Sequence, residues 1–532
     1  MANNTRQILI ESILGGHSQS ANFSAPDEFR ASFGINPALG ATSVDVRPSG
    51  FLRPVSSQQV GSALSGAPLW MKTNPKDGNV YVYSYGGSVY SVLNESPFTI
   101  TGLTDLNDGG TAKGNGLEYY DNYIYASRDT TVARYGPLNG SPSWTDDYWV
   151  SGLSKTELTN TTYFGDKTYD IKHPNHILHR HSDGKLYILD VVDNKGTVHF
   201  IQTTKTTVEG DTDNGSTYTK LQVGYGLWPT AVCSYGTQLV IAFYEGSNST
   251  TRQTRAKVAF WDTTSQNINQ ITWTEFSDNI ITSIVNQNGI LYFTSTNYRS
   301  NGFRLTRYIG GYSFEEVRYF EYEPAPFPGA VDGTADRLLF GTLGVEPKNN
   351  SGGAVLSLGL QNSNLSRGLF NVLGIGSQLV SSLVLSGNNS NLAQDGPMVG
   401  GTTGSSGNGI YISNGQSTYG THPSIWWSQE YRIGRPFKIT KIIIPLTSDI
   451  TSGVKIAPTL YMDGTEIQAG AGTTIELNLI NYDNYPNKKN IVIRPPSAIG
   501  QNSFFLELKW LGTVLSVVSL PITIEYEVLP NE

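Results

Sequence analysis

Cysteine and charged residues are scarce in this sequence. The shortage of cysteine excludes disulfides within the chain and cysteine metal clusters. Among 532 residues there is one cysteine, Cys233, inside the apolar run TAVCSYGTQLVIAF. A single thiol cannot close a disulfide within the chain or build a cysteine metal cluster. Charged residues make up 15% of the chain, against roughly 25% in an average soluble domain. We therefore expect a large protein that is held together without disulfides.

The sign of the charge and the lack of long apolar runs exclude two classes of partner. The formal net charge is -8, from 36 basic and 44 acidic residues, whereas nucleic-acid binding by phosphate neutralisation needs a basic surface. No run approaches the about 18 apolar residues of a membrane-spanning helix. The start, MANNTRQILIESILGG, lacks the basic segment and long apolar core of a secretion signal. We expect no sequence-specific nucleic-acid binding and no membrane insertion.

Glycine (57 residues) and tyrosine (30 residues) are plentiful. Aromatic and β-branched side chains suit pleated strands, and glycine and asparagine supply the positive φ of tight hairpin turns. The composition therefore predicts an all-β protein with many turns.

From about residue 67 the chain repeats one pattern: an apolar strand, a polar turn, a second strand rich in Tyr, Val, Ile or Phe, and usually a third strand. The clearest second strands are NVYVYS, NYIYAS, KLYILD, QLVIAF, ILYFTS and RLLFGT, which begin at Asn79, Asn122, Lys185, Gln238, Ile290 and Arg337. Turns such as KDGN, SDGK and NQNG join first to second strands, as short hairpins require. This spacing is typical of propeller blades, which repeat about every 40 to 50 residues with extra length in loops.

Six repeats are regular and a seventh is irregular. The seventh runs from SQLVSSLVLSG through PMVGGTTG and GIYISNG to SIWWSQEYRIG. An odd repeat is expected where the two ends of a ring meet. We therefore predict a six- or seven-bladed β-propeller over residues 61–434.

The two ends of the chain differ from this pattern. After Gly434, segments such as FKITKIIIPL and SFFLELKWLG alternate more cleanly, which predicts a jelly-roll-like C-terminal β-sandwich over residues 435–532. Residues 1–60 fit neither pattern and are predicted to form an extended N-terminal arm that lies on a neighbouring subunit. The arm would bury its apolar side chains there: Ile8, Leu9, Ile10, Ile13, Leu14, Phe23, Phe29 and Phe33.

Four of the seven histidines lie in IKHPNHILHRHSDGKLYILD, at His173, His176, His179 and His181. Alternation along a strand places His179 and His181 on one face. A zinc site needs three or four converging ligands, and the nearest carboxylate, Asp183, lies in a turn. Polar groups near the inner edge of a blade are the favoured interpretation, and a metal site is the alternative.

Signatures of enzymes are missing. The sequence contains no G-x-S-x-G, H-E-x-x-H or P-loop motif, and HSDGKLY lacks the spacing and the tryptophan of the turns of propeller sialidases. An acidic stretch, YSFEEVRYFEYEPAP, is interpreted as a solvated strand and loop, with cation binding as the alternative; its carboxylates belong to Glu315, Glu316, Glu321 and Glu323. We predict no catalytic, cofactor-binding or metal-binding residue, and no cofactor.

The adjacent tryptophans of SIWWSQEYRIGRPF, Trp426 and Trp427, alternate across a strand. One is expected to face a core and the other a neighbour such as the second domain. A platform on which a sugar stacks is the alternative.

Several phrases together resemble a group of structural proteins of tailed bacteriophages, found in tail or other virion modules. They are ILGGHSQS, GNGLEYYDNYIYASRDTTVARYGPLNGSPSW, HPNHILHRHSDGKLYILD and SIWWSQEYRIGRPFKITKIIIPL. The resemblance covers residues 1–434 and extends into the sandwich, but it brings no site residues with it.

The resemblance implies a non-enzymatic structural component of a phage virion, in a tail, nozzle or connector-like assembly. It would assemble in the host cytoplasm as a closed ring or trimer and contact other virion proteins. The alternative is a module for host attachment that binds a surface glycan, and a propeller glycan hydrolase is a third, weaker hypothesis.

Overall fold

The computed structural model describes the greater part of the chain, in segments. These are residues 5–12, 16–17, 28–33, 35, 51–52, 54, 57–85, 87–93, 98–103, 116–128, 132–149, 177–192, 195–202, 221–245, 255–265, 271–297, 302–320, 325–333, 337–345, 352–359, 369–375, 379–384, 398–402, 407–413, 424–463 and 473–530.

The prediction of an all-β protein is confirmed. The regular structure of these segments is almost entirely β-strand, and the one helix among them is the 3-10 turn η4 (Pro328–Ala330). No helix in the described segments has the length and apolarity needed to cross a membrane.

Seven four-stranded antiparallel sheets follow one another through the middle of the described chain. The first comprises β6 (Pro68–Thr73), β7 (Val80–Ser84), β8 (Val89–Val92) and β9 (Ile100–Leu103). The second comprises β10 (Leu117–Tyr120), β11 (Tyr123–Ser127), β12 (Val132–Gly136) and β13 (Ser143–Trp149). The third comprises β14 (Ile177–Arg180), β15 (Lys185–Val192), β16 (Lys195–Gln202) and β17 (Leu221–Tyr225). The fourth comprises β18 (Leu227–Tyr235), β19 (Gln238–Glu245), β20 (Lys257–Trp261) and β21 (Thr272–Glu275).

The last three sheets have the same form. The fifth comprises β22 (Ile280–Gln287), β23 (Ile290–Thr296), β24 (Phe303–Gly310) and β25 (Ser313–Phe320). The sixth comprises β26 (Val331–Gly333), β27 (Arg337–Val345), β28 (Gly352–Gly359) and β29 (Leu369–Gly374). The seventh comprises β30 (Leu379–Val384), β31 (Met398–Thr402), β32 (Asn408–Ser413) and, from far earlier in the chain, β5 (Ser57–Leu64). The six second strands expected from the sequence are confirmed as β7, β11, β15, β19, β23 and β27.

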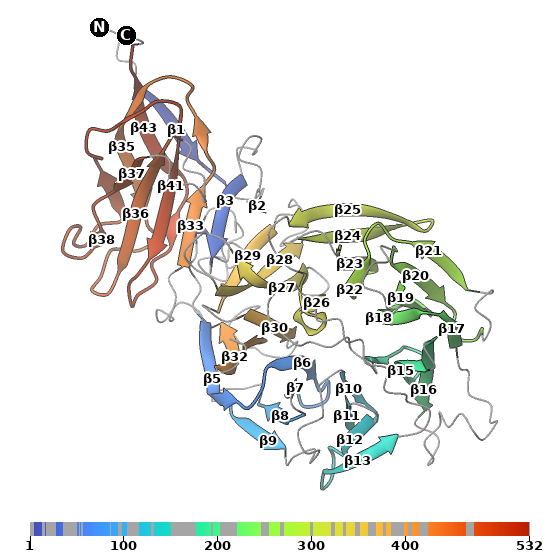
Figure 1. Cartoon of the computed structure of the whole chain (residues 1–532). Coiled ribbons are helices and arrows are strands. Elements are labelled where there is room, and N and C mark those ends of the chain that lie inside the picture. The colour runs from blue at the N-terminus through green and yellow to red at the C-terminus, as the bar shows by residue number, and fades with distance from the viewer. Residues whose placement is uncertain are drawn as a thin grey trace.

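The seven sheets stand around a common centre as in a β-propeller, with their first strands innermost (Figure 1). We call this part the ring. Second strands such as VYVYS of β7 are buried along their whole length, because each sheet packs both faces against its neighbours. Apolar residues therefore follow one another without interruption in these strands, whereas a strand with one solvent-exposed face would alternate apolar and polar residues.

The ends of first strands and the turns that follow them also join neighbouring sheets. The Tyr120 hydroxyl donates to the carbonyl oxygen of Gly184 over 2.6 Å, and the Asn286 amide donates to the carbonyl oxygen of Ser234 over 3.0 Å. Gly184 has φ +79° and nothing within 4 Å of where a Cβ would lie, so the turn conformation, and not lack of space, favours glycine there.

The seventh sheet closes the ring differently from our prediction. Its fourth strand is β5, whereas SIWWS forms β33 (Ser424–Ser428) in another sheet. At the seam, the hydroxyls of Ser381 and Ser382 both donate to the carbonyl oxygen of Pro68, over 2.8 and 2.6 Å. A strand from the N-terminal side thus joins strands from the C-terminal side, and the boundary predicted at residues 60/61 falls inside β5.

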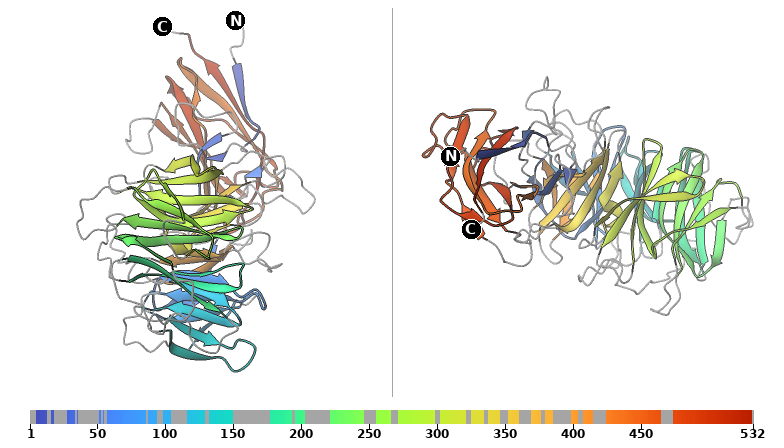
Figure 2. Two further views of the ribbon diagram at one scale, coloured as in Figure 1. Left: turned by 90° about the vertical axis from the view of Figure 1, so that its right-hand side faces the viewer. Right: turned by 90° about the horizontal axis from the view of Figure 1, so that it is seen from above.

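Two further sheets stand beside the ring, next to β28 and β29 (Figures 1 and 2). The five-stranded sheet contains β1 (Thr5–Ile10), β43 (Ile522–Val528), β35 (Phe437–Pro445), β39 (Asn490–Ile493) and β40 (Ile499–Gly500). The eight-stranded sheet contains β2 (Gly16–His17), β3 (Glu28–Phe33), β33, β41 (Ser503–Trp510), β36 (Lys455–Met462), β37 (Thr473–Glu476), β34 (Tyr431–Arg432) and β38 (Ile480–Asn481). β4 (Phe51–Leu52) pairs with β42 (Val518–Ser519). We call these strands the two-sheet unit.

The N-terminal segment that we predicted to lie on a neighbouring subunit lies, where it is described, in the chain's own sheets. β1 pairs with β43, and β3 pairs with β33. Ile10 is buried, but Leu9 is 45% exposed. The sequence offered no partner strands for this segment because those partners lie several hundred residues away; Ile13, Leu14 and Phe23 lie outside the described segments.

One apolar core runs from the two-sheet unit into the ring. It contains Trp426 of β33 and Ile524 of β43, and it continues to Leu339 of β27, Val355 of β28 and Val380 of β30. Burial of apolar surface is the main stabilising term in folding, so a shared core favours unfolding of the two parts together.

Candidate functional site

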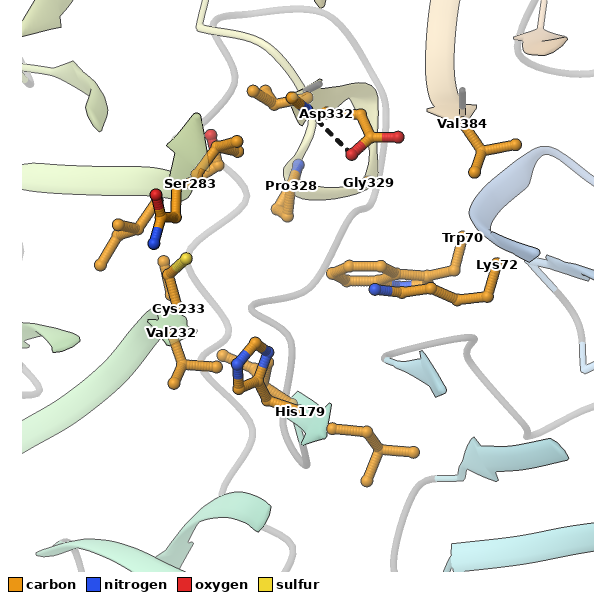
Figure 3. Close-up of a pocket in the computed structure, with 18 of the residues that line it drawn as sticks. Trp70, Lys72, His179, Val232, Cys233, Ser283, Pro328, Gly329, Asp332 and Val384 are labelled. Carbon is orange, nitrogen blue, oxygen red and sulfur yellow. Dashed lines mark hydrogen bonds between the residues drawn. The ribbon is translucent and has the colours of Figure 1, made fainter. Parts of the chain in front are cut away.

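A cavity of about 530 Å³ lies where the innermost strands of the ring converge. Residues of β6, β14, β18, β22, β26 and β30 line it, together with the η4 turn. Figure 3 shows Trp70 and Lys72 reaching into it side by side from β6, with His179 and Cys233 nearby. Residues 70 and 72 share a face because side chains alternate along a strand.

The Lys72 ammonium is the main cation of the cavity. Its Nζ lies 3.1 Å from Oε2 of Glu118, a residue of β10, and Asp332 lines another wall. The Glu118 carboxylate raises the pKa of Lys72, against the opposing effect of burial, and Asp332 adds to the rise. Lys72 is therefore a fixed cation in an ion pair and not a base poised near neutral pH.

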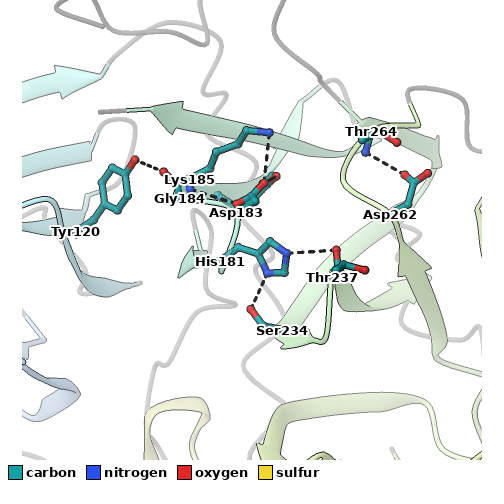
Figure 4. A network of polar contacts seen from close by, with 10 residues as sticks. Tyr120, His181, Asp183, Gly184, Lys185, Ser234, Thr237, Asp262 and Thr264 are labelled. Atoms are coloured by element: carbon teal, nitrogen blue, oxygen red, sulfur yellow. Dashed lines mark hydrogen bonds and ion pairs between the residues drawn. The ribbon is translucent and has the colours of Figure 1, made fainter. Parts of the chain in front are cut away.

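Two histidines meet one serine at the edge of the cavity. Nε2 of His179 and Nδ1 of His181 each lie 2.8 Å from the Ser234 hydroxyl of β18. His181 Nε2 lies 3.3 Å from the carbonyl oxygen of Thr237 (Figure 4). Burial lowers the pKa of His179 to about 3, and the nearby Lys72 cation adds to the effect. The imidazole of His179 is therefore neutral at pH 7 and links two adjacent sheets.

The single cysteine is uncharged at neutral pH because its thiol keeps its proton. Cys233 is 9% exposed, and burial raises the pKa of its thiol to about 11. A thiolate is the reactive form of cysteine. Cys233 therefore packs as a small apolar side chain in the wall of the cavity.

The site residues named from the sequence are only partly brought together. His179 and His181 share a face as predicted, and Asp183 instead accepts from the Tyr187 hydroxyl over 2.7 Å. His173 and His176 lie outside the described segments. In the residues that the structure describes, no group of three His, Cys, Asp or Glu side chains is placed to hold a metal ion.

The two glutamates of the acidic stretch that the structure describes each form an ion pair with an arginine. Glu315 accepts from Arg307 Nε over 2.6 Å, and Glu316 lies 2.8 Å from Arg304 Nε. Both arginines belong to β24, the strand beside β25. Glu321 and Glu323 lie outside the described segments.

The adjacent tryptophans are both buried. Trp426 is 1% exposed and lies in the shared core. Trp427 is 6% exposed, packs with Phe505 and with Ala354 of the ring, and donates from Nε1 to the Glu507 carboxylate over 2.6 Å. Neither indole presents a face on which a sugar could stack.

Sequence reasoning missed Trp70, Lys72, Glu118 and Asp332. All four lie on innermost strands, namely β6, β10 and β26. Lys72 is the one charged residue in PLWMKT, and a single charge in the first strand of a repeat is the signal that would have pointed to the centre of the ring.

Changing His179 to asparagine is expected to reduce the pH dependence of stability. Since His179 has a pKa of about 3 in the folded chain and about 6.5 when unfolded, only the unfolded state gains a proton between these values. Stability is therefore lost as the pH falls below about 6.5, at a slope approaching 1.4 kcal/mol per pH unit. Urea unfolding of both proteins at pH 7.5 and 5.5 gives the free energy of unfolding at each pH. If this free energy changes by the same amount between the two pH values in both proteins, His179 is not held neutral in the folded chain.

Comparison with known proteins identifies no family. No protein-family model matches the chain, and no curated protein matches it. Among solved structures, the β-propeller domain of Myceliophteria thermophila Cps50 (Swd1) is similar at 10% identity and a TM-score of 0.41, over 67% of this chain and 98% of that one. U3-55K is similar at 11% identity and 0.43, over 67% and 98%. Chaetomium thermophilum Raptor is similar at 9% identity and 0.44, over 69% of this chain and 29% of that one. At these TM-scores the likeness adds nothing to what the sheets themselves show.

Proposed function

We propose that this chain is a non-enzymatic structural component of a tailed-phage virion, in a tail, nozzle or connector-like assembly. In this proposal it is a seven-bladed propeller closed by β5 and joined to a C-terminal β-sandwich, and it acts through contacts with copies of itself and with other virion proteins. It would be assembled in the host cytoplasm.

The observation that carries a structural role is the way in which the two parts are joined. One apolar core spans the two-sheet unit and the ring. The N-terminal strands β1 and β3 lie in the two-sheet unit, and β5 lies in the ring. Such a body resists relative movement of its parts without any disulfide, as a virion component must.

The ionisable groups of the cavity support the absence of catalysis. Lys72 is held as a cation by Glu118, His179 is neutral, and Cys233 is protonated. General acid–base and nucleophilic catalysis favour groups whose pKa lies near the working pH. None of these three has such a pKa.

The composition of purified particles tests the proposal. The chain is expected in density-purified virions at a constant stoichiometry, measured by quantitative mass spectrometry, and antibodies against it should label particles in electron micrographs. Absence from the particles would overturn the proposal. So would turnover of polysaccharide by the isolated chain that is lost when Glu118 is changed to glutamine.

The second candidate function is binding of a host surface glycan, and exposed tyrosines support it. Tyr312, at the turn between β24 and β25, is 48% exposed, and Tyr225 at the end of β17 is 74% exposed. Aromatic rings present an apolar face together with a polar hydroxyl, which suits a sugar. A glycan array probed with the full chain, and with Tyr312→Ala, distinguishes this candidate.

A further inference from the structure

The free edges of the described sheets are protected with one exception. An exposed edge strand offers unpaired N–H and C=O groups to other chains, and proteins blunt such edges by making them short or bulged. Here the outer strands β2, β9, β21, β37 and β39 have four residues or fewer. The outer strands β5, β13, β17, β25 and β29 carry shifts of register.

The exception is β1, the terminal strand of the five-stranded sheet. All six of its residues pair with β43 in unbroken register, from Thr5 opposite Glu527 to Ile10 opposite Ile522. Among the described residues, β1 has a partner strand on one side only. Its sequence, TRQILI, has no proline and no lysine, and its one charge belongs to Arg6.

A row of three apolar side chains and one threonine, on the face of the sheet that carries Leu9, leads to this edge. Val492, Ile443, Thr523 and Leu9 lie opposite one another across β39, β35, β43 and β1. Leu9 is 45% exposed and Val492 is 39% exposed. A strand added beside β1 would cover Leu9 and extend the row.

We propose that β1 pairs with β1 of a second copy of this chain, so that two five-stranded sheets become one continuous sheet across a twofold axis. A second copy is the favoured occupant because it also brings the one long, unbroken edge of the described chain, so both free edges are satisfied at once. This contact deepens the proposed structural role, on which its biological meaning rests. It joins two copies, whereas from the sequence we expected a closed ring or trimer.

The charge on β1 is compatible with this arrangement. A twofold axis perpendicular to the sheet makes the two strands antiparallel, and an axis through Gln7 sets Gln7 opposite Gln7 of the second copy. Arg6 then faces Ile8, and Thr5 faces Leu9. No like charges meet, whereas like charges directly opposite each other destabilise a sheet.

Substitution of Gln7 tests the contact in the full-length chain. Gln7 is exposed and lies opposite Glu525 of β43. Lys441 already pairs with that carboxylate over 2.8 Å, so a charge at position 7 should leave the fold intact. Gln7→Lys sets two ammonium groups opposite each other and is expected to weaken the dimer about tenfold, measured by native mass spectrometry across a dilution series. A mixture of Gln7→Lys and Gln7→Glu should restore association as a heterodimer. Gln222→Lys makes the same change at an exposed position of the outer strand β17 in the ring; it is the matched control and should keep the wild-type affinity.

Disulfide trapping gives an independent measurement. Gln7→Cys is expected to form a covalent dimer under mild oxidation, because paired residues of adjacent strands lie within the span of a disulfide. The native thiol does not compete, since Cys233 is buried. A wild-type chain that stays monomeric, a dimer unchanged by Gln7→Lys, or failure of Gln7→Cys to cross-link would overturn the proposal. Absence of the chain from virions would overturn the proposed function and leave this contact standing.

Discussion

Replacing Asp278 with alanine is expected to destabilise the folded chain by about 2–4 kcal/mol, because two neutral donors lose their acceptor. Asp278 lies just before β22 and is 1% exposed. Its carboxylate accepts from the Ser295 hydroxyl over 2.6 Å, from the Asn297 amide over 2.7 Å and from the Arg304 guanidinium over 2.5 Å. Alanine would leave the serine and the amide without this acceptor, and buried donors without acceptors are costly. The free energy of unfolding in urea, followed by circular dichroism, measures the loss.

One variant separates the charge of Asp278 from its hydrogen bonds, and a second variant, at an exposed ion pair, is the control. Asp278→Asn keeps an acceptor oxygen but removes the charge that faces Arg304, so an intermediate loss is expected. Glu315→Gln breaks an ion pair with Arg307 whose side chains are 49% and 26% exposed, and such a surface pair contributes about 0–1 kcal/mol. Equal losses for Asp278→Ala and Glu315→Gln would show that the buried network has no special weight.

The repeating part of the fold could be predicted from the sequence because its signal is local. Each second strand, such as VYVYS of β7, is a short apolar run beside a turn whose residues tolerate positive φ, including Gly184 (+79°) and Asn288 (+50°). Hairpins need information from about a dozen neighbouring residues only. Sequence alone therefore indicates the second strands of six of the seven sheets and the turns that precede them.

Pairing between distant segments could not be predicted in the same way. β5, SQQVGSAL, contains a glycine and has only two buried apolar residues, Val60 and Leu64. Its fit to β32 depends on an edge that forms about 350 residues later. SIWWS looks like another propeller strand, yet it pairs with β3 and β41. A strand that is buried on both faces carries the same signal wherever it lies, so the sequence of β33 does not say which sheet contains it.

The candidate site shows the same limit. The spacing of His179 and His181 indicated a shared face, and the structure confirms it, but their common partner Ser234 belongs to the next sheet. Lys72 and Glu118 lie on different strands of neighbouring sheets, and nothing local marks them as a pair. The centre of a ring is built from one strand of each sheet, so its chemistry appears only when all the sheets are in place.

Replacing Trp426 with alanine is expected to cost about 3–5 kcal/mol and to weaken the coupling between the two-sheet unit and the ring. Trp426 is 1% exposed in the core that both parts share. Its strand, β33, pairs with β3 on one side and β41 on the other. Loss of the indole leaves a cavity that the surrounding strands can close only in part. Differential scanning calorimetry should show one transition for the wild type, and a broader or divided transition at lower temperature for Trp426→Ala.

Phenylalanine variants show whether size or hydrogen bonding sets this cost. The Nε1 of Trp426 is buried without a hydrogen-bond partner among the described residues, so Trp426→Phe removes an unsatisfied donor and should lose much less stability than Trp426→Ala. Trp510 lies in the same core, but its Nε1 donates to the carbonyl oxygen of Ser516 over 2.8 Å. Trp510→Phe is therefore expected to lose about 1 kcal/mol more stability than Trp426→Phe, because this hydrogen bond is lost. Two well-separated transitions in the wild-type chain would contradict the shared core, since parts that unfold independently cannot depend on one tryptophan for their joint stability.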